Sequence, residues 1–155
     1  MENAERTLQM LQQDENVRQM ENFVQHGKIS TYEHCKRVTD LSRRLNRHLH
    51  LNADEETLVT GAMLHDFYLY DWHSDEKPRR EKGLKRLQKL HGFEHPKKAS
   101  ENARKYFNVN KDVQHVIDSH MWPLTLTKMP RTREAWIVCL ADKWASLQET
   151  LFMRR

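Results

Sequence analysis

The chain has 155 residues, among them only 4 Gly, 4 Pro and 2 Cys. This length favours a single domain spanning residues 1–155, and a composition rich in helix-forming residues with so few turn formers excludes an all-β sandwich. Two cysteines exclude a disulfide framework, and no apolar run approaches the roughly 18 residues of a membrane span. With no secretory leader at the N-terminus, we expect a cytoplasmic protein that has no membrane contact.

The formal net charge of +4 is concentrated in one segment. Residues 77–105 hold 11 Lys or Arg residues against 3 Glu residues, whereas the rest of the chain is slightly acidic. A local positive field attracts phosphate-bearing ligands, but a solvated helix face has the same composition. Both interpretations remain open for this segment.

The first half of the chain predicts three helices. Residues 1–27 form a polar N-terminal helix with a few apolar positions, and Gly27 is suited to ending it. The sequence from Ser30 to Glu33 has the pattern of a capping box, which predicts the start of a second helix. The acidic run that follows Asn52 predicts a third helix, whose small residues Gly61 and Ala62 permit close packing and which ends near Asp66.

The second half of the chain predicts a loop and four more helices. Residues 67–73 form an aromatic exit and residues 74–81 a loop, followed by a basic helix over residues 81–90. A further helix begins near Phe93 and buries Ala99, Ala103 and Tyr106. The last two helices cover residues 110–121 and about 132–152, and the buried face of the last contains Ile137, Leu140, Ala141, Trp144 and Leu147. The predicted fold class is all-α, a compact bundle of about six to seven helices.

Six residues have the chemistry of metal ligands and lie on five of the predicted helices, mostly at the apolar edge. A single buried histidine is usually a satisfied core residue, but four histidines with two aspartates at helix edges are harder to explain in that way. Imidazoles and carboxylates hold divalent metals firmly enough to activate water. The sequence therefore predicts a metal-centred hydrolase with the ligands His34, His65, Asp66, His95, His120 and Asp142.

The order of these residues resembles that of the HD-domain phosphohydrolase superfamily. His34 is followed by the pair His65-Asp66 at the end of a helix rich in small residues, and Asp142 lies within Leu-Ala-Asp-Lys-Trp. The resemblance covers about residues 30–150. It implies an HD-type helical bundle in which residues 28–152 form the metal-binding core. It also implies that His34, His65, Asp66 and Asp142 hold one metal ion.

Two further histidines resemble those of the subgroup of this superfamily that has dinuclear sites. By this resemblance His95 and His120 hold a second metal ion, and Asp66 bridges the two ions. Iron or manganese is expected, and zinc, cobalt or nickel also suits such ligands. The Gly-Tyr-Pro signature of one cyclic-dinucleotide subgroup is absent after Asp66.

The implied reaction is attack of a metal-activated water on phosphorus. In this reaction Asp66 orients the nucleophile. Lys143 either contacts the phosphate or is an ordinary surface lysine. His73 either protonates the leaving oxygen or only packs within the aromatic segment. Trp122 either stacks on a nucleobase or anchors the core. The candidate substrate-binding residues are Arg79, Arg80, Lys97, Lys98 and Trp122.

We therefore expect an enzyme, a phosphodiesterase or phosphatase that cleaves a small phosphorylated molecule or a nucleotide. One alternative is a dinuclear-iron oxygenase with the same ligand set. A second is a non-catalytic HD module that binds nucleotides or nucleic acid, although the sequence has no nucleic-acid-binding signature. The N-terminal helix could pack on its own core or on another subunit, so a homodimer is a further expectation.

Overall fold

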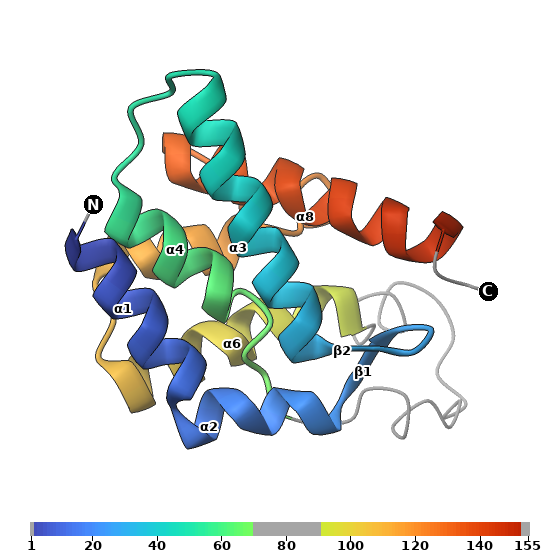
Figure 1. The fold of residues 1–155 in the computed structure, drawn as a ribbon. Coiled ribbons are helices and arrows are strands. Elements are labelled where there is room, and N and C mark those ends of the chain that lie inside the picture. Colours follow the sequence, from blue (N-terminus) through green and yellow to red (C-terminus); the bar gives the residue numbers. More distant parts are fainter. Residues whose placement is uncertain (1, 70–90, 153–155) are drawn as a thin grey trace.

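The computed structural model describes residues 2–69 and 91–152, and helices dominate both ranges (Figure 1). The all-α prediction is confirmed, and seven α-helices lie in the described ranges. One two-stranded antiparallel hairpin and one short 3-10 helix accompany them. In chain order the elements are α1 (Glu2–Gln13), α2 (Glu15–Arg18), η1 (Gln19–Asn22), β1 (Val24–His26), β2 (Ile29–Ser30), α3 (Thr31–His48), α4 (Glu55–Leu64), α6 (His91–Phe107), α7 (Lys111–Ser119) and α8 (Arg133–Phe152).

The N-terminal region differs from the single helix predicted for residues 1–27. Asp14 has an extended backbone, and its side chain accepts hydrogen bonds from the amides of Asn16 and Val17. This N-cap ends α1 and starts α2, because an aspartate side chain competes with the backbone carbonyls for these amides. Gly27 does not end a helix either: it lies between β1 and β2 with φ of 61°, a conformation that glycine adopts without strain.

Side-chain caps fix the starts of three later helices. The predicted capping box is present at α3, where the Ser30 hydroxyl accepts from the Glu33 amide and the Glu33 carboxylate accepts from the Ser30 amide. Asp54 caps α4 and Asn110 caps α7 in the same manner, each accepting a hydrogen bond from an amide in the first turn. These caps set the register of the helices and therefore the direction of their inner residues.

α4 is the central helix of the molecule. Every residue from Leu58 to Tyr68 is buried, and α4 packs against α1, α3, α7 and α8 (Figure 1). One apolar cluster lies between α4 and the N-terminal helices, and a second lies between α4 and α8. The C-terminal end of α4 consequently lies deep in the core, and His65 and Asp66 follow directly from it.

Some residues predicted to be buried are exposed. On α8, Leu140, Trp144 and Leu147 are about half exposed, while Ile137 and Ala141 are buried as expected. α8 is apolar on two faces, so apolar spacing alone could not identify the inner one. Tyr106 on α6 is also exposed, although Ala99 and Ala103 on the same helix are buried. α6 begins at His91, earlier than predicted, and the predicted basic helix over residues 81–90 lies outside the described residues.

None of the helices in the described ranges combines the length and the apolar character that a membrane span needs.

Replacing Gly61 with alanine tests the close contact of α4 and α7. A Cβ atom at Gly61 would lie 2.6 Å from Val116 Cγ1 and 2.9 Å from Val116 Cβ, so the two helices would have to separate. We expect Gly61→Ala to lower the free energy of unfolding by about 1–3 kcal/mol, measured by urea denaturation. The double variant Gly61→Ala/Val116→Ala should lose less than the sum of the two single variants. Full additivity would contradict the contact.

Candidate metal centre

The six predicted metal ligands lie together in one buried cluster at the centre of the bundle. Their exposed fractions range from 0% to 7%. Nitrogen and oxygen atoms within 4.8 Å of one another form three groups: His34, His65 and Asp66; His65, His120 and Asp142; Asp66, His95 and His120. Side chains from α3, α6, α8 and the C-terminal ends of α4 and α7 thus converge, while their role as ligands remains a prediction.

One half of the cluster contains His34, His65 and Asp142 around one oxygen of Asp66. His34 Nε2 lies 3.0 Å from Asp142 Oδ1 and 3.8 Å from Asp66 Oδ2. His65 Nε2 lies 3.4 Å from Asp66 Oδ2 and 3.7 Å from Asp142 Oδ1. Two imidazole nitrogens and two carboxylate oxygens therefore face a common centre.

The other half contains His95 and His120 around the second oxygen of Asp66. Asp66 Oδ1 lies 3.2 Å from His95 Nε2 and 3.5 Å from His120 Nε2. The two histidine Nε2 atoms are 2.9 Å apart. Asp66 turns one oxygen to each half, which is the arrangement that a carboxylate between two adjacent cations requires.

Two histidines gain their orientation from the helix ends on which they lie. His65 and His120 are the C-cap residues of α4 and α7. Their Nδ1 atoms donate to the carbonyls of Ala62 at 2.8 Å and Ile117 at 2.7 Å. The last carbonyls of a helix have no intrahelical partner, so the helix end supplies the acceptor. Because Nδ1 carries the proton in the neutral ring, Nε2 presents a lone pair to the cluster.

Two functional residues were not found from the sequence. Glu149 Oε2 accepts a hydrogen bond from His34 Nδ1 at 2.9 Å. Glu149 lies seven residues after Asp142 on α8, and this spacing of two helical turns was a signal that the sequence did contain. Gln25 Nε2 donates to Asp66 Oδ2 at 2.7 Å, but nothing in the sequence indicated that β1 would reach the cluster.

Gln25 is itself held by two hydroxyl groups. Its Oε1 accepts from Tyr68 Oη at 2.7 Å and from Thr31 Oγ1 at 3.2 Å. The amide is thereby oriented with its nitrogen toward Asp66, because the oxygen is already engaged by both donors. The hairpin therefore fixes the central carboxylate from outside the set of six residues.

The charges of the cluster are strongly coupled. Burial alone would raise the pKa of Asp66, but the charge of His65 and the close contacts with the Nε2 atoms of His65, His95 and His120 hold that pKa well below its usual value. Burial would likewise raise the pKa of Asp142, and its contacts with His34 and His65 hold it far lower. Both aspartates are therefore anionic, as metal ligands must be.

The pKa values of two histidines in the cluster shift in opposite directions. Burial lowers the pKa of His120. Burial alone would also lower the pKa of His34, but hydrogen bonds to Asp142 and Glu149 raise that pKa to about 10. His34 is accordingly protonated when the site holds no cation, and a metal ion held by His34 Nε2 would take the place of the proton on that nitrogen.

The chemistry of the cluster fits a divalent cation. His65 Nε2 and Asp66 Oδ1 are buried and have no hydrogen-bond partner in the part of the chain that the structure describes. Buried polar atoms without partners are costly, and both point to the cluster centre, where a cation would satisfy them. A set of imidazole nitrogens and carboxylate oxygens suits iron, manganese, zinc, cobalt or nickel.

Three further predicted site residues and Lys143, all within the described ranges, lie outside the cluster. Lys143 Nζ donates to the carbonyl of His120 at 2.9 Å, so it binds the end of α7 to α8. Trp122 is partly buried and packs edge-on against Trp136, with ring centroids 5.1 Å apart. Lys97 and Lys98 are exposed on α6. The predictions for His73, Arg79 and Arg80 fall on residues that the structure does not describe.

Comparison with protein families agrees with this geometry. The family model described as HD domain matches residues 31–147, which is most of the chain. No curated protein and no solved structure matches the chain. The chain belongs to the HD-domain family, which in general comprises metal-dependent hydrolases and also includes non-catalytic members. The resemblance seen in the order of the six residues is thereby confirmed.

Replacing His65 with alanine tests the ligand assignment. The variant removes the nitrogen that faces both Asp66 and Asp142, and we expect bound metal to fall at least about tenfold. Metal content by elemental analysis after reconstitution with manganese measures this. Replacing the exposed His48 with alanine should leave the metal content unchanged. Equal metal content in His65→Ala and the unaltered protein would contradict the assignment.

Proposed function

We propose that this HD-domain protein is a metal-dependent phosphohydrolase that cleaves a small phosphorylated molecule or a nucleotide. The observation that supports this most is the position of Asp66, which turns one oxygen to His34 and His65 and the other to His95 and His120. A buried carboxylate shared by two histidine-lined halves suits a pair of adjacent divalent ions, an arrangement common in enzymes that cleave phosphate esters.

In the proposed site, the residues of the cluster form two overlapping sets of ligands. His34, His65, Asp66 and Asp142 would hold one ion, and His95, His120 and Asp66 the other. When bound, the metals lower the pKa of a water molecule toward neutrality and neutralise charge on the phosphate oxygens. The anionic state of Asp66 and Asp142, with the pKa of each held low, keeps both carboxylates available over the pH range in which phosphate esters are cleaved.

Positive charge beside the cluster supports an anionic substrate. Lys97 and Lys98 follow His95 within one turn of α6, and both are exposed. A phosphate attracted to these ammonium groups is brought next to a histidine of the centre. The proposal extends this role to Arg79 and Arg80 of the same basic segment, and to Trp122 as a surface for a nucleobase.

Two further residues complete the proposed reaction. His73 would protonate the oxygen of the leaving group. Lys143 would contact the phosphate, for which its ammonium group must exchange its bond to the His120 carbonyl for one to the substrate. The proposed substrate is a small molecule rather than nucleic acid.

The activity is tested with the full chain reconstituted with manganese or, without oxygen, with ferrous iron. The substrates are a chromogenic phosphomonoester, a chromogenic phosphodiester and nucleoside mono-, di- and triphosphates. Released phosphate is the readout for all of them except the diester, which is followed by the colour of its released chromophore. We expect hydrolysis of at least one substrate and a loss of kcat of about 100-fold or more in Asp66→Asn. Asp112→Asn, at an exposed position of α7, is the matched control and should retain full activity.

Each alternative has its own outcome in this experiment. Oxygen uptake once the iron-loaded protein is exposed to air, with no phosphate released from any substrate, would replace the proposal by an oxygenase. Tight binding of a nucleotide without turnover would replace it by a non-catalytic module. Failure of every substrate with both metals would also count against hydrolysis.

A further inference from the structure

A buried carboxylate lies behind the metal cluster. Glu149 on α8 is 2% exposed, and its Oε2 accepts from His34 Nδ1 at 2.9 Å. The other nitrogen of the same ring, Nε2, faces Asp142 Oδ1 at 3.0 Å. The imidazole of His34 is thus held between a carboxylate inside the cluster and a carboxylate outside it.

His34 needs a side-chain partner for a reason that lies in its helix. His65 and His120 end their helices and use backbone carbonyls as acceptors. His34 lies within α3, where carbonyls accept the amides of the following turn. An acceptor for Nδ1 must therefore come from another element, and Glu149 provides it from α8.

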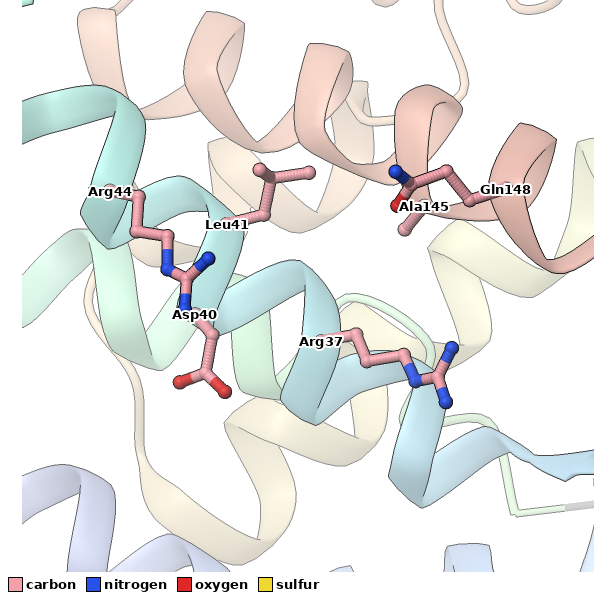
Figure 2. Close-up of a pocket in the computed structure, with 6 residues that line it drawn as sticks. All are labelled: Arg37, Asp40, Leu41, Arg44, Ala145 and Gln148. Atoms are coloured by element: carbon pink, nitrogen blue, oxygen red, sulfur yellow. The ribbon is translucent and has the colours of Figure 1, made fainter. Parts of the chain in front are cut away.

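The remaining oxygen of Glu149 is buried and lies near Arg37. Glu149 Oε1 has no hydrogen-bond partner in the described ranges, and Arg37 Nη1 lies 3.9 Å from it. Arg37 borders a groove between α3 and α8, together with Asp40, Leu41, Arg44, Ala145 and Gln148 (Figure 2).

We propose that Glu149 is a positioning residue that holds the proton of His34 on Nδ1 and aims Nε2 at the metal. A buried carboxylate is a costly group where an apolar side chain would pack equally well, so its presence calls for a specific partner. A carboxylate acceptor fixes the tautomer and ring orientation of a metal-ligating histidine and raises its basicity. The proposal rests on the metal centre of the proposed function but not on the substrate.

The test compares Glu149→Ala and Glu149→Gln with Glu134→Gln. Glu134 lies in the first turn of the same helix, at the opposite end from Glu149, and accepts a hydrogen bond from the Asp54 amide, so it is a matched control. Affinity for zinc is measured by competition with a chromogenic chelator. We expect Glu149→Ala to weaken zinc binding about 10–100-fold, Glu149→Gln to lie between it and the unaltered protein, and Glu134→Gln to have no effect.

Two-bond nitrogen–proton NMR spectra of the zinc-loaded proteins give a readout that a purely structural role would not move. In the unaltered protein we expect His34 to bind zinc through Nε2 with its proton on Nδ1, and in Glu149→Ala we expect some of the His34 rings to bind zinc through Nδ1 or to leave the metal. Unchanged zinc affinity and an unchanged His34 tautomer in a folded Glu149→Ala would overturn the proposal. If Glu149→Ala does not fold, an unchanged zinc affinity in Glu149→Gln would overturn the proposal. A protein that binds zinc with the expected dependence on Glu149 but hydrolyses nothing refutes the proposed function alone.

A second inference rests on the outer face of α8. Leu140, Trp144, Leu147 and Leu151 are 56%, 54%, 48% and 62% exposed. Their spacing of four, three and four residues places them in one stripe along the helix. The inner face of α8 is apolar as well, and a helix that is apolar on both faces is normally covered on both.

The stripe is symmetric about its own midpoint. A two-fold axis across α8 between Ala145 and Ser146 would place Leu140 against Leu151 of a second copy and Trp144 against Leu147 of a second copy. Such self-complementarity is what a two-fold dimer interface requires. Lys143 is the exposed charged residue between Leu140 and Leu151, and its ammonium group already donates to the His120 carbonyl.

Exposed apolar side chains also lie in the loop before α8, where Leu124, Leu126 and Met129 are 49%, 76% and 49% exposed. We infer that a second copy of this chain docks on the outer face of α8.

Sedimentation velocity of the full chain over a range of concentrations tests this inference. We expect a dimer that Leu147→Glu converts to a monomer, because a charge at the centre of the stripe would be buried without a partner. Leu49→Glu, at an equally exposed leucine that follows α3, should leave the dimer intact. A monomer at about 100 µM, where even weak micromolar dimers form, would overturn the inference, and so would a dimer that persists in Leu147→Glu.

Discussion

A single buried carboxylate, Asp66, organises the centre of this protein. Its two oxygens lie 3.2–3.8 Å from the Nε2 atoms of four histidines that come from four helices. An anion in an apolar interior is tolerated only when opposite charge and hydrogen bonds surround it. Because α4 is buried, the Asp66 carboxylate at its C-terminal end lies in the core, and the other helices provide the histidines that surround it. The cluster and the bundle therefore depend on each other: neither the ligands nor the packing around α4 can be displaced alone.

The helices also determine which nitrogen of each ring faces inward. At the ends of α4 and α7 the free backbone carbonyls orient His65 and His120, and no additional side chain is needed. Within α3 the backbone carbonyls are already engaged by the helix, and the Glu149 carboxylate from α8 accepts the hydrogen bond from His34 instead. Position within a helix thus decides whether a ligand histidine requires a partner from elsewhere in the fold.

Much of this arrangement could be predicted from the sequence, and the exceptions have physical causes. The capping box at Ser30 and the family order of the ligands depend on local patterns, and both are present in the structure. The break at Asp14 was missed because a capping aspartate inside a helix-prone stretch changes little in the apolar spacing. The inner face of α8 was ambiguous because both of its faces are apolar. Gln25 could not be found because its role arises only when the hairpin packs on the cluster.

The hairpin has a consequence for where this domain begins. The family match starts at residue 31, yet Gln25 on β1 donates to Asp66, and Thr31 and Tyr68 in turn anchor its amide. The segment that precedes the family match therefore contributes a direct contact to the central aspartate of the candidate metal centre. A fragment trimmed to the family boundary would retain all six candidate ligands and still leave the central aspartate open to solvent on one side.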